Sequence, residues 1–409
     1  MALQHPLVFL LLSAALILLS LPSAKRRLAG WFLVLSLAFV ALQYQSAPVS
    51  LLIPIASLFL QYPVLKLMLR VKARPYRVAL HWGWLLLTLG GFVIVKRYVW
   101  ITDLFVARDL LPGTLETVGV SFLIFRQIHL AIDVRDGLTP SIRLLDYLNY
   151  TLAFWTFLAG PVQRFAPFCE QFKAITATGA VTPNREVLLG LNRALLGFFK
   201  MFIVGQALDK LGAAAFPTQA VLRAVSASIV FPLHLYINFS GYCDIMIGLA
   251  RAVGFTLPEN FRHPYLARNA QDFWTRWHIT LSEFFRDYLY FPLLTSMSRR
   301  FPALPSMIVA TLISFSVMGA WHGSDMRFAI FGFVHGLAVV TMLLYQQGLR
   351  AVLSKKQLDW YRRSRVINVG AVLCFQTFVI LSFLPFRYDM SELLARGQLI
   401  IQLLGGPGE

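Results

Sequence analysis

The chain has 409 residues, of which 57% are hydrophobic and only 14% are charged, and its mean hydropathy is +0.65. Soluble domains carry about 25% charged residues, and a water-soluble core cannot absorb this much apolar surface, so a soluble fold is excluded. The formal net charge of +18 would suggest nucleic-acid binding in a soluble protein. Here the basic residues are spread between apolar runs, which indicates that they set topology and meet anionic lipid headgroups. We therefore expect membrane lipids, and no nucleic acid, as partners.

Apolar stretches long enough to cross a bilayer, which takes roughly 20 residues, recur along the whole chain. They are continuous rather than alternating, which predicts helices and not the strands of a barrel. They lie near residues 6–22, 28–47, 48–65, 78–95, 115–132, 147–162, 187–208, 221–250, 304–321, 328–347 and 366–384. The sequence therefore predicts an all-α, polytopic membrane protein with a bundle of about ten to eleven transmembrane helices. We expect them to form a single membrane domain over residues 1–409.

The basic residues also predict how the chain is oriented in the membrane. No Lys or Arg precedes the first apolar run, and Lys25-Arg26-Arg27 follows it, so we interpret this run as a retained first span and not as a signal peptide. By the positive-inside rule these charges and the basic cluster at residues 66–77 face the cytoplasm. The N-terminus is then expected to lie outside.

Residues 155–336 concentrate Trp, His, Gly, Pro, Asn and paired charges, so function is expected there. Within them, segment 268–292 is too charged to span the bilayer. Its apolar residues recur at helical spacing, which predicts an amphipathic helix along the membrane surface. The apolar face of that helix would carry Trp274, Trp277, His278, Leu281, Phe284, Phe285 and Tyr288. Asp272 can pair with Arg276 four residues later, and taken alone the pattern is an anchor in which His278 has no chemical role.

A second histidine stands at the end of an uncharged run. Gly319-Ala320-Trp321-His322-Gly323 closes the apolar stretch that begins at Leu304. Burial disfavours the charged form of imidazole, so a neutral His322 could take a proton from a hydroxyl group. The alternative is an ordinary interfacial histidine that hydrogen-bonds a carbonyl. Asp325 could orient the ring of His322 only if the helix continues through Gly323.

Polar residues also interrupt the apolar stretch 221–250. The motif Asn238-Phe239-Ser240-Gly241-Tyr242-Cys243-Asp244 lies inside it, and on a helix Ser240 and Asp244 share one face. An intramembrane Asp is a functional-site hypothesis by default, but Asp244 could equally be the structural partner of an Arg on a neighbouring helix. Gly160-Pro161 breaks another helix at its membrane end, and we interpret that break as a shaping element.

Four pieces of sequence, in this order, carry a resemblance to a known family. They are Val120-Ser121-Phe122 through Ile132-Asp133, the Gly160-Pro161-Val162-Gln163-Arg164 turn, the stretch from Asn238 to Pro292 including DFWTRWHITLSEFFRDYLYFPL, and GAWHG with FGFVHG at 319–336. With these pieces the chain resembles the membrane-bound O-acyltransferase family, and more closely its bacterial branch that includes alginate O-acetyltransferases and teichoic-acid D-alanyl transfer proteins. The resemblance covers a core of about residues 115–340. It implies that family's helical bundle, with surface-lying amphipathic helices.

The resemblance also implies which residues form the site. His322, in the W-H-G element, is then the presumed catalytic residue, and His278, in the R-W-H element, is the second invariant polar position. The residues predicted to contact substrate are Trp321, Trp277, Asn238, Ser240, Asp244 and Arg276. In one departure from the family pattern, Leu293 runs into Leu294-Thr295-Ser296 where the family often has a Gly pair, so contacts near the donor are expected to differ.

The implied reaction is transfer of an acyl group from a thioester to a hydroxyl. The donor would be a cytoplasmic phosphopantetheine carrier protein or an acyl-CoA, acting as substrate, and no bound cofactor or metal is expected. The acyl group would be acetyl or D-alanyl, and the acceptor an extracytoplasmic polysaccharide or cell-envelope polymer, reached directly or through a relay acyltransferase. His322 would act as general base, and His278 would position the acceptor or stabilise the oxyanion. The expected location is the bacterial cytoplasmic (inner) membrane.

Two other classes of function remain open from the sequence. A polytopic transporter would also use broken helices and an intramembrane Asp244, but inverted internal repeats are not evident in the chain. A scaffold subunit of a polysaccharide export complex fits the hydropathy, yet it leaves both histidines without a purpose. Thioester-dependent ester formation separates the enzyme from both alternatives.

Overall fold

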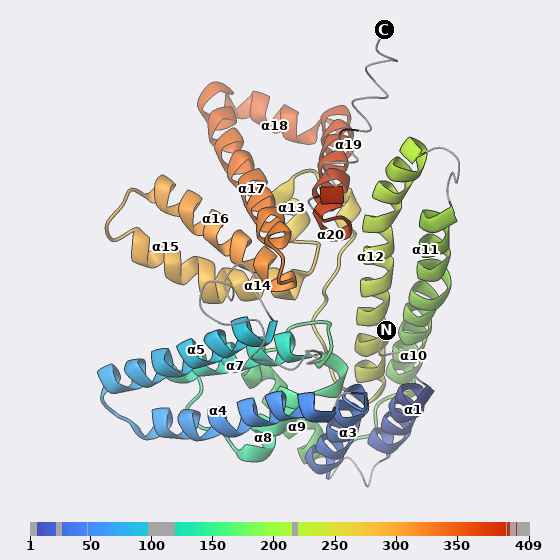
Figure 1. Cartoon of the computed structure of the whole chain (residues 1–409), viewed down its shortest axis with the longest axis vertical. Helices are drawn as coiled ribbons and strands as arrows, with labels where there is room; N and C mark the ends of the chain where they lie inside the picture. Colours follow the sequence, from blue (N-terminus) through green and yellow to red (C-terminus); the bar gives the residue numbers. More distant parts are fainter. Residues whose placement is uncertain are drawn as a thin grey trace. The chain divides into compact units, whose positions relative to one another are not determined.

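The computed structural model describes residues 6–21, 27–46, 48–96, 119–214, 220–389, 391–392 and 398. Within these ranges the regular structure is helical, and the β-type pairing is a single isolated bridge between Phe261 and Trp277. The prediction of an all-α polytopic membrane protein is confirmed. Figure 1 shows the helices along the chain.

The chain divides into two compact units, each built from separate stretches. The first unit holds residues 1–197 and 242–259, and the second holds residues 198–241 and 260–409. The helices of the first unit are α1 (Pro6–Ser20), α3 (Leu28–Gln43), α4 (Leu52–Arg70), α5 (Arg74–Lys96), α7 (Val120–Arg135), α8 (Leu144–Leu152), α9 (Phe165–Thr178) and α10 (Asn184–Phe198). Helix α12 (Ala220–Ala252) contributes to both units, so the single domain predicted for residues 1–409 stays a prediction.

The second unit carries the motifs of the C-terminal half. Besides α12, its α-helices are α11 (Gly205–Ala214), α13 (Ala270–Trp274), α14 (Ile279–Phe285), α15 (Phe291–Met297), α16 (Ala303–His322), α17 (Met326–Val352), α18 (Lys355–Arg363), α19 (Arg365–Ser382) and α20 (Leu384–Arg387). Two π-helical stretches, Phe199–Val204 and Arg286–Tyr290, lie between them. Figure 1 shows α16 and α17, in orange, side by side.

Six helical stretches among the described residues are long and apolar enough to cross a membrane. They are Pro48–Arg70, Arg74–Lys96, Asn184–Leu211, Ala303–His322, Met326–Val352 and Arg365–Arg387, and each matches a predicted span. Large apolar side chains on them point outward, among them Phe59, Leu86 and Val366. Such outward apolar surface is what a hydrocarbon environment requires. The predicted total of about ten to eleven spans stays a prediction, because the six candidate spans were found among the described residues only.

The span predicted at residues 147–162 is wrong. Helix α8 has only nine residues and ends at Leu152, and a short 3₁₀ turn, Phe154–Thr156, follows it. Nine residues rise about 14 Å, less than half of the hydrocarbon thickness. Gly160 then adopts a positive φ of 105°, which glycine tolerates and other residues rarely do. Helix α8 therefore ends before the Gly160-Pro161 break and is too short to cross the bilayer.

Two buried polar side chains of α7, Arg126 and His129, find their partners within the first unit. The guanidinium group of Arg126 donates to the backbone oxygens of Tyr150 and Thr151, at 3.1 and 2.7 Å. His129 pairs with Asp133 through Nδ1, at 3.2 Å, and its Nε2 accepts the backbone N–H of Phe165, at 2.9 Å. Since both nitrogens of His129 are occupied, this Asp–His pair is a structural brace for the start of α9 and not a catalytic dyad.

Candidate active site

The end of α16 is fixed by close contact with α17. A Cβ atom added at Gly319 would lie only 2.7 Å from the Cα of Gly332, and one at Gly323 would overlap the ring of Phe328. Small residues let helices approach this closely, which gives the two glycines of the GAWHG motif a packing role. His322 is the last residue of α16, and its ring lies 4.7 Å from the Trp321 ring, centroid to centroid.

The condition under which Asp325 could orient His322, a helix that continues through Gly323, is not met. Helix α16 ends at His322, and Gly323 is extended, with φ −164°. Asp325 instead caps α17, where its carboxylate accepts the backbone N–H of Arg327 at 2.9 Å. The ring of His322 packs on Phe386 of α20, with ring centroids 5.1 Å apart.

The single amphipathic helix predicted for segment 268–292 is also wrong. Helix α13 ends at Trp274, His278 adopts a left-handed conformation with φ 45°, and α14 begins at Ile279. The break has a tertiary cause, because this segment pairs with residues 260–262, which precede it. The backbone N–H of Arg262 donates to Arg276 O at 2.9 Å, and the backbone N–H of Ile279 donates to Asn260 O at 3.0 Å. The ion pair of Asp272 with Arg276, N to O 2.6 Å, is confirmed.

His278 is buried and held on one side. Its Nδ1 lies 3.2 Å from Oδ1 of Asn260, and Phe239 packs on its ring with centroids 4.9 Å apart. Left-handed backbone at a residue other than Gly, Asn or Asp costs of order 1–3 kcal/mol and often marks functional sites. Burial, and then the nearby charge of His322, lower the pKa of His278 well below its usual value. His278 lies outside the six candidate spans, and its ring is neutral at physiological pH.

Because His322 acts on His278 electrostatically, the structure brings the two predicted catalytic histidines into one neighbourhood of the second unit. Of the predicted contact residues, Trp321 touches His322 directly. Trp277 is instead buried in an aromatic core and stacks on Phe273 at 5.5 Å. A core position accounts for Trp277 without any substrate.

The other predicted contact residues have identifiable surroundings. Arg276 is engaged by Asp272, Ser240 donates to its own helix at Ile237 O, 3.5 Å away, and the amide of Asn238 lies beside Gly205. These contacts neither require nor exclude a substrate. Their roles in binding stay predictions.

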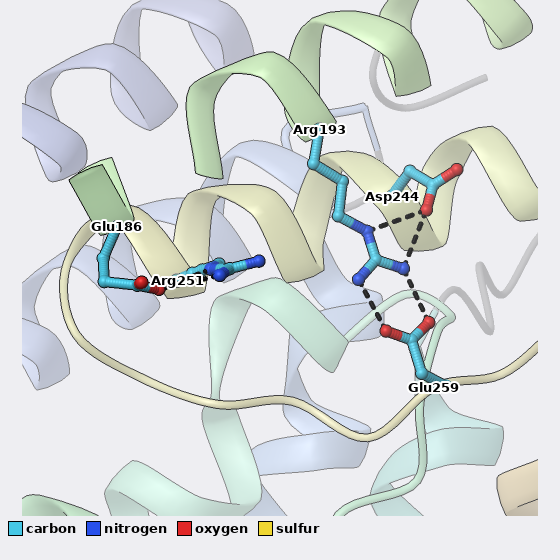
Figure 2. A network of polar contacts seen from close by, with 5 residues as sticks. All are labelled: Glu186, Arg193, Asp244, Arg251 and Glu259. Carbon is cyan, nitrogen blue, oxygen red and sulfur yellow. Dashed lines mark hydrogen bonds and ion pairs between the residues drawn. The ribbon is translucent and has the colours of Figure 1, made fainter. Parts of the chain in front are cut away.

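Asp244 belongs to an ion-pair cluster of the first unit, shown in Figure 2. Arg193 of α10 donates to its carboxylate at 2.9 Å and, with two parallel bonds of 2.6 Å, to that of Glu259. A second ion pair, between Arg251 of α12 and Glu186 of α10 at 2.8 Å, joins the same two helices that carry Asp244 and Arg193. Asp244 therefore has an Arg partner on a neighbouring helix, as the structural alternative expects, and its role in substrate binding stays a prediction.

A cavity of about 550 Å³ lies in the second unit between α13, α14, α16 and α17. Ile279, next to His278, and Met318, one turn before His322, are among its lining residues. Trp274 and Ser314 also line the cavity, and their Nε1 and Oγ atoms are buried and, among the residues that the structure describes, have no hydrogen-bond partner. The cavity thus has mostly apolar lining residues, and two of the residues that line it carry buried polar atoms without a partner among the described residues.

Asn260, Arg193 and Glu259 were missed by sequence reasoning. Asn260 and Glu259 follow a Pro in a short loop, and nothing local marks the histidine and arginine that they contact. Arg193 had a usable signal, because it is a charged residue inside an apolar run that also matches a candidate span. Within the described ranges, no group of three or more His, Cys, Asp or Glu side chains is arranged to hold a metal ion.

Comparison with known proteins places this geometry in a family. The chain is 33% identical over 281 residues to a probable alginate O-acetylase of Azotobacter vinelandii, covering 67% of this chain and 53% of the relative. It is 27% identical over 397 residues to the teichoic acid D-alanyltransferase of Streptococcus thermophilus, covering 90% of each. It is 33% identical over 233 residues to the peptidoglycan O-acetyltransferase of Helicobacter pylori, covering 56% of this chain and 43% of the relative.

The matched region spans about half the length of the alginate and peptidoglycan relatives. Residues 105–385 match the family described as membrane-bound O-acyltransferase. That match includes α16 with His322 and the segment with His278. The resemblance first given by the motifs is therefore confirmed, and the chain belongs to the membrane-bound O-acyltransferase family.

Proposed function

We propose that this protein transfers an acyl group from a thioester donor to a hydroxyl of an extracytoplasmic polymer, with His322 as the general base. The observation that carries the proposal is the neighbourhood of His278 and His322 beside the cavity of about 550 Å³. An imidazole at the end of an apolar span, with a second one in its neighbourhood, is a residue type that can accept a hydroxyl proton.

The proposed step is balanced without any group other than donor and acceptor. The acceptor oxygen forms a bond to the thioester carbon as its proton passes to His322. The carbon–sulfur bond then breaks, and the departing thiolate takes the proton back from His322. General-base catalysis of this kind contributes about 10²–10⁴-fold. His278 positions the acceptor or stabilises the oxyanion.

The cavity supports a role in donor binding. A thioester on a phosphopantetheine arm or on coenzyme A is a narrow chain with amide groups, and it needs apolar walls with a few hydrogen-bonding groups. Trp274 and Ser314 line the cavity, and their buried Nε1 and Oγ, without hydrogen-bond partners in the part of the chain that the structure describes, support this proposal. We propose a cytoplasmic carrier protein or acyl-CoA as donor.

The names of the relatives support acetyl or D-alanyl as the acyl group, and a cell-envelope polymer or secreted polysaccharide as the acceptor. Transfer would be direct or through a relay acyltransferase. We propose the bacterial cytoplasmic membrane as the location, because a cytoplasmic donor and an extracytoplasmic acceptor meet only there.

Proteoliposomes supplied with radiolabelled acetyl-pantetheine test the proposal. Oligomannuronate, muropeptides and a glycerol-phosphate polymer serve as acceptors, and ester formation is counted. We expect His322→Gln to reduce transfer by at least about 10²-fold without changing thermal stability in detergent. The matched control is His263→Asn, because His263 is exposed and also has a positive φ, 47°. Transfer by a folded His322→Gln protein near the wild-type rate would show that the base is another group.

The same vesicles separate the alternatives. Flux of a polysaccharide precursor across the membrane without any ester formed would favour a transporter. Ester formation that appears only when a second acyltransferase is added would favour the relay, with this chain still handling the thioester. A protein that neither uses the thioester nor carries the precursor across the membrane would favour a scaffold.

A further inference from the structure

The side chain of Asn260 identifies the tautomer of His278. Asn260 is fully buried, and its Oδ1 accepts from the backbone N–H of Thr280 at 3.3 Å and from the Thr280 hydroxyl at 3.0 Å. A backbone N–H can only donate, so the Asn260 atom facing it is the amide oxygen and not the amide nitrogen. The same oxygen lies 3.2 Å from Nδ1 of His278.

An oxygen can only accept, so Nδ1 of His278 carries the hydrogen in this contact. A neutral imidazole has one ring hydrogen, and Nε2 therefore holds a lone pair. Among the described residues, no protein group donates to that nitrogen. Burial lowers the pKa of His278, which keeps the ring in this neutral form.

The ring has little freedom to turn away from Asn260. The backbone on both sides is tied, because Ile279 N–H donates to Asn260 O at 3.0 Å and Leu281 N–H donates to His278 O at 3.1 Å. Phe239 and Phe261 pack on the imidazole, with centroids at 4.9 and 6.5 Å. The direction of the Nε2 lone pair is therefore fixed before any substrate arrives.

We propose that Asn260 is a positioning residue that holds His278 in the Nδ1–H tautomer, so that Nε2 accepts a hydrogen bond from the acceptor substrate. A lone pair cannot stabilise an oxyanion, because an oxyanion needs donors. Of the two roles open to His278, acceptor positioning is the one that this tautomer permits. The substrate part of this inference rests on the proposed function, and the tautomer part does not.

The tautomer also narrows the chemical class of the acceptor. A hydroxyl has one proton, so the hydroxyl that donates to His322 during attack cannot also donate to His278. Two accepting imidazoles in one site match an acceptor with two neighbouring hydroxyls, as on a sugar ring. We therefore expect a vicinal diol of a polysaccharide to be preferred over a polymer with isolated hydroxyls.

Magic-angle-spinning NMR of the full chain in lipid bilayers, with ¹⁵N-labelled histidine, tests the tautomer directly. The His278 signals are assigned by their loss in His278→Asn, in which Asn tolerates the left-handed backbone. We expect a protonated Nδ1 and a bare Nε2 in the wild type, and the same in Asn260→Asp, whose carboxylate keeps the accepting oxygen. We expect Asn260→Ala to show a mixture. A wild-type spectrum with hydrogen on Nε2 overturns the inference, even if Asn260→Ala fails to fold.

Kinetics in the proteoliposomes test the substrate role. We expect Asn260→Ala to raise the KM for oligomannuronate about tenfold, the equivalent of one lost hydrogen bond, and to leave both the KM for acetyl-pantetheine and its hydrolysis by water unchanged. Asn260→Asp should restore the acceptor KM. Loss of thioester hydrolysis in Asn260→Ala would point to an oxyanion role and overturn the assignment.

Two comparisons complete the test. Asn149→Ala removes another buried asparagine, which donates to Ala29 O at 3.0 Å in the first unit, and it should change neither the tautomer nor the KM values. Oligomannuronate offers neighbouring hydroxyls, whereas the glycerol-phosphate polymer offers isolated ones. A higher kcat/KM for the glycerol-phosphate polymer would overturn the vicinal-diol assignment, and it would leave the proposed transfer itself intact.

Discussion

The ion-pair cluster around Arg193 and the histidine site beside α16 both place polar side chains in an apolar protein, but they use them differently. In the cluster of Figure 2, the guanidinium of Arg193 is matched by the carboxylates of Asp244 and Glu259. At the histidine site, Nδ1 of His278 is bound and Nε2 faces no protein donor within the described residues.

This difference separates stabilising polar groups from candidate reactive ones. Buried polar groups are normally hydrogen-bonded, and one that keeps unused capacity needs an explanation. His129 and Asp133 form an Asp–His pair, but both ring nitrogens of His129 are engaged. His278 and the cavity residues Trp274 and Ser314 keep hydrogen-bonding capacity for a ligand.

The largest effect on stability that we expect is at Trp274. Its indole packs on Phe273, Phe315 and His335, with ring centroids 5.3 to 5.6 Å apart. Trp274→Ala should cost about 3–5 kcal/mol and lower expression and the detergent Tm, whereas His278→Asn should leave the Tm nearly unchanged. Trp274→Phe keeps a ring without Nε1–H, so it should fold and raise the KM for acetyl-pantetheine. Equal loss of membrane insertion in Trp274→Ala and His278→Asn would make His278 structural.

A smaller effect is expected in the ion-pair cluster. Arg193→Met leaves two carboxylates without their partner, and because the Arg193 side chain is 26% exposed, the cost should be about 1–3 kcal/mol, between those of surface and buried pairs. Asp244→Asn should cost less, because Arg193 keeps Glu259. Both variants should retain the acceptor KM when rates are corrected for folded protein. A raised acceptor KM in folded Asp244→Asn would instead support the predicted binding role of Asp244.

The smallest effect is a pH dependence of stability from His278. Its folded pKa lies below the unfolded value, so the unfolded state binds the proton first as the pH falls through about 6.5. The wild type should lose stability below that pH, by at most about 1.4 kcal/mol per pH unit, until the lowered pKa is reached. His322 is the titratable group acting on this ring, and Asn260, Thr280, Phe239 and Phe261 around it are uncharged. Parallel Tm curves for wild type and His278→Asn from pH 7 to 5 would refute this.

The spans and the end of α16 that carries His322 could be predicted from sequence because their signals are local. An uncharged run of about 20 residues needs no partner to be read as a membrane helix, and α16 begins and ends within one residue of the predicted 304–321. The same interpretation failed at 147–162, where α8 ends at Leu152 after nine residues and a 3₁₀ turn, Phe154–Thr156, follows.

The chain by itself thus determined the membrane class, most helices and the identity of the two histidines, since hydropathy and short motifs lie within single segments. Only the tertiary structure decided that segment 268–292 breaks at His278, because the break depends on pairing with Asn260, 18 residues earlier. It also decided the partner of Asp244, since Arg193 lies 51 residues away in the chain. Helical periodicity describes neighbours within one helix, and it carries no information on which distant segment supplies the matching hydrogen bond or charge.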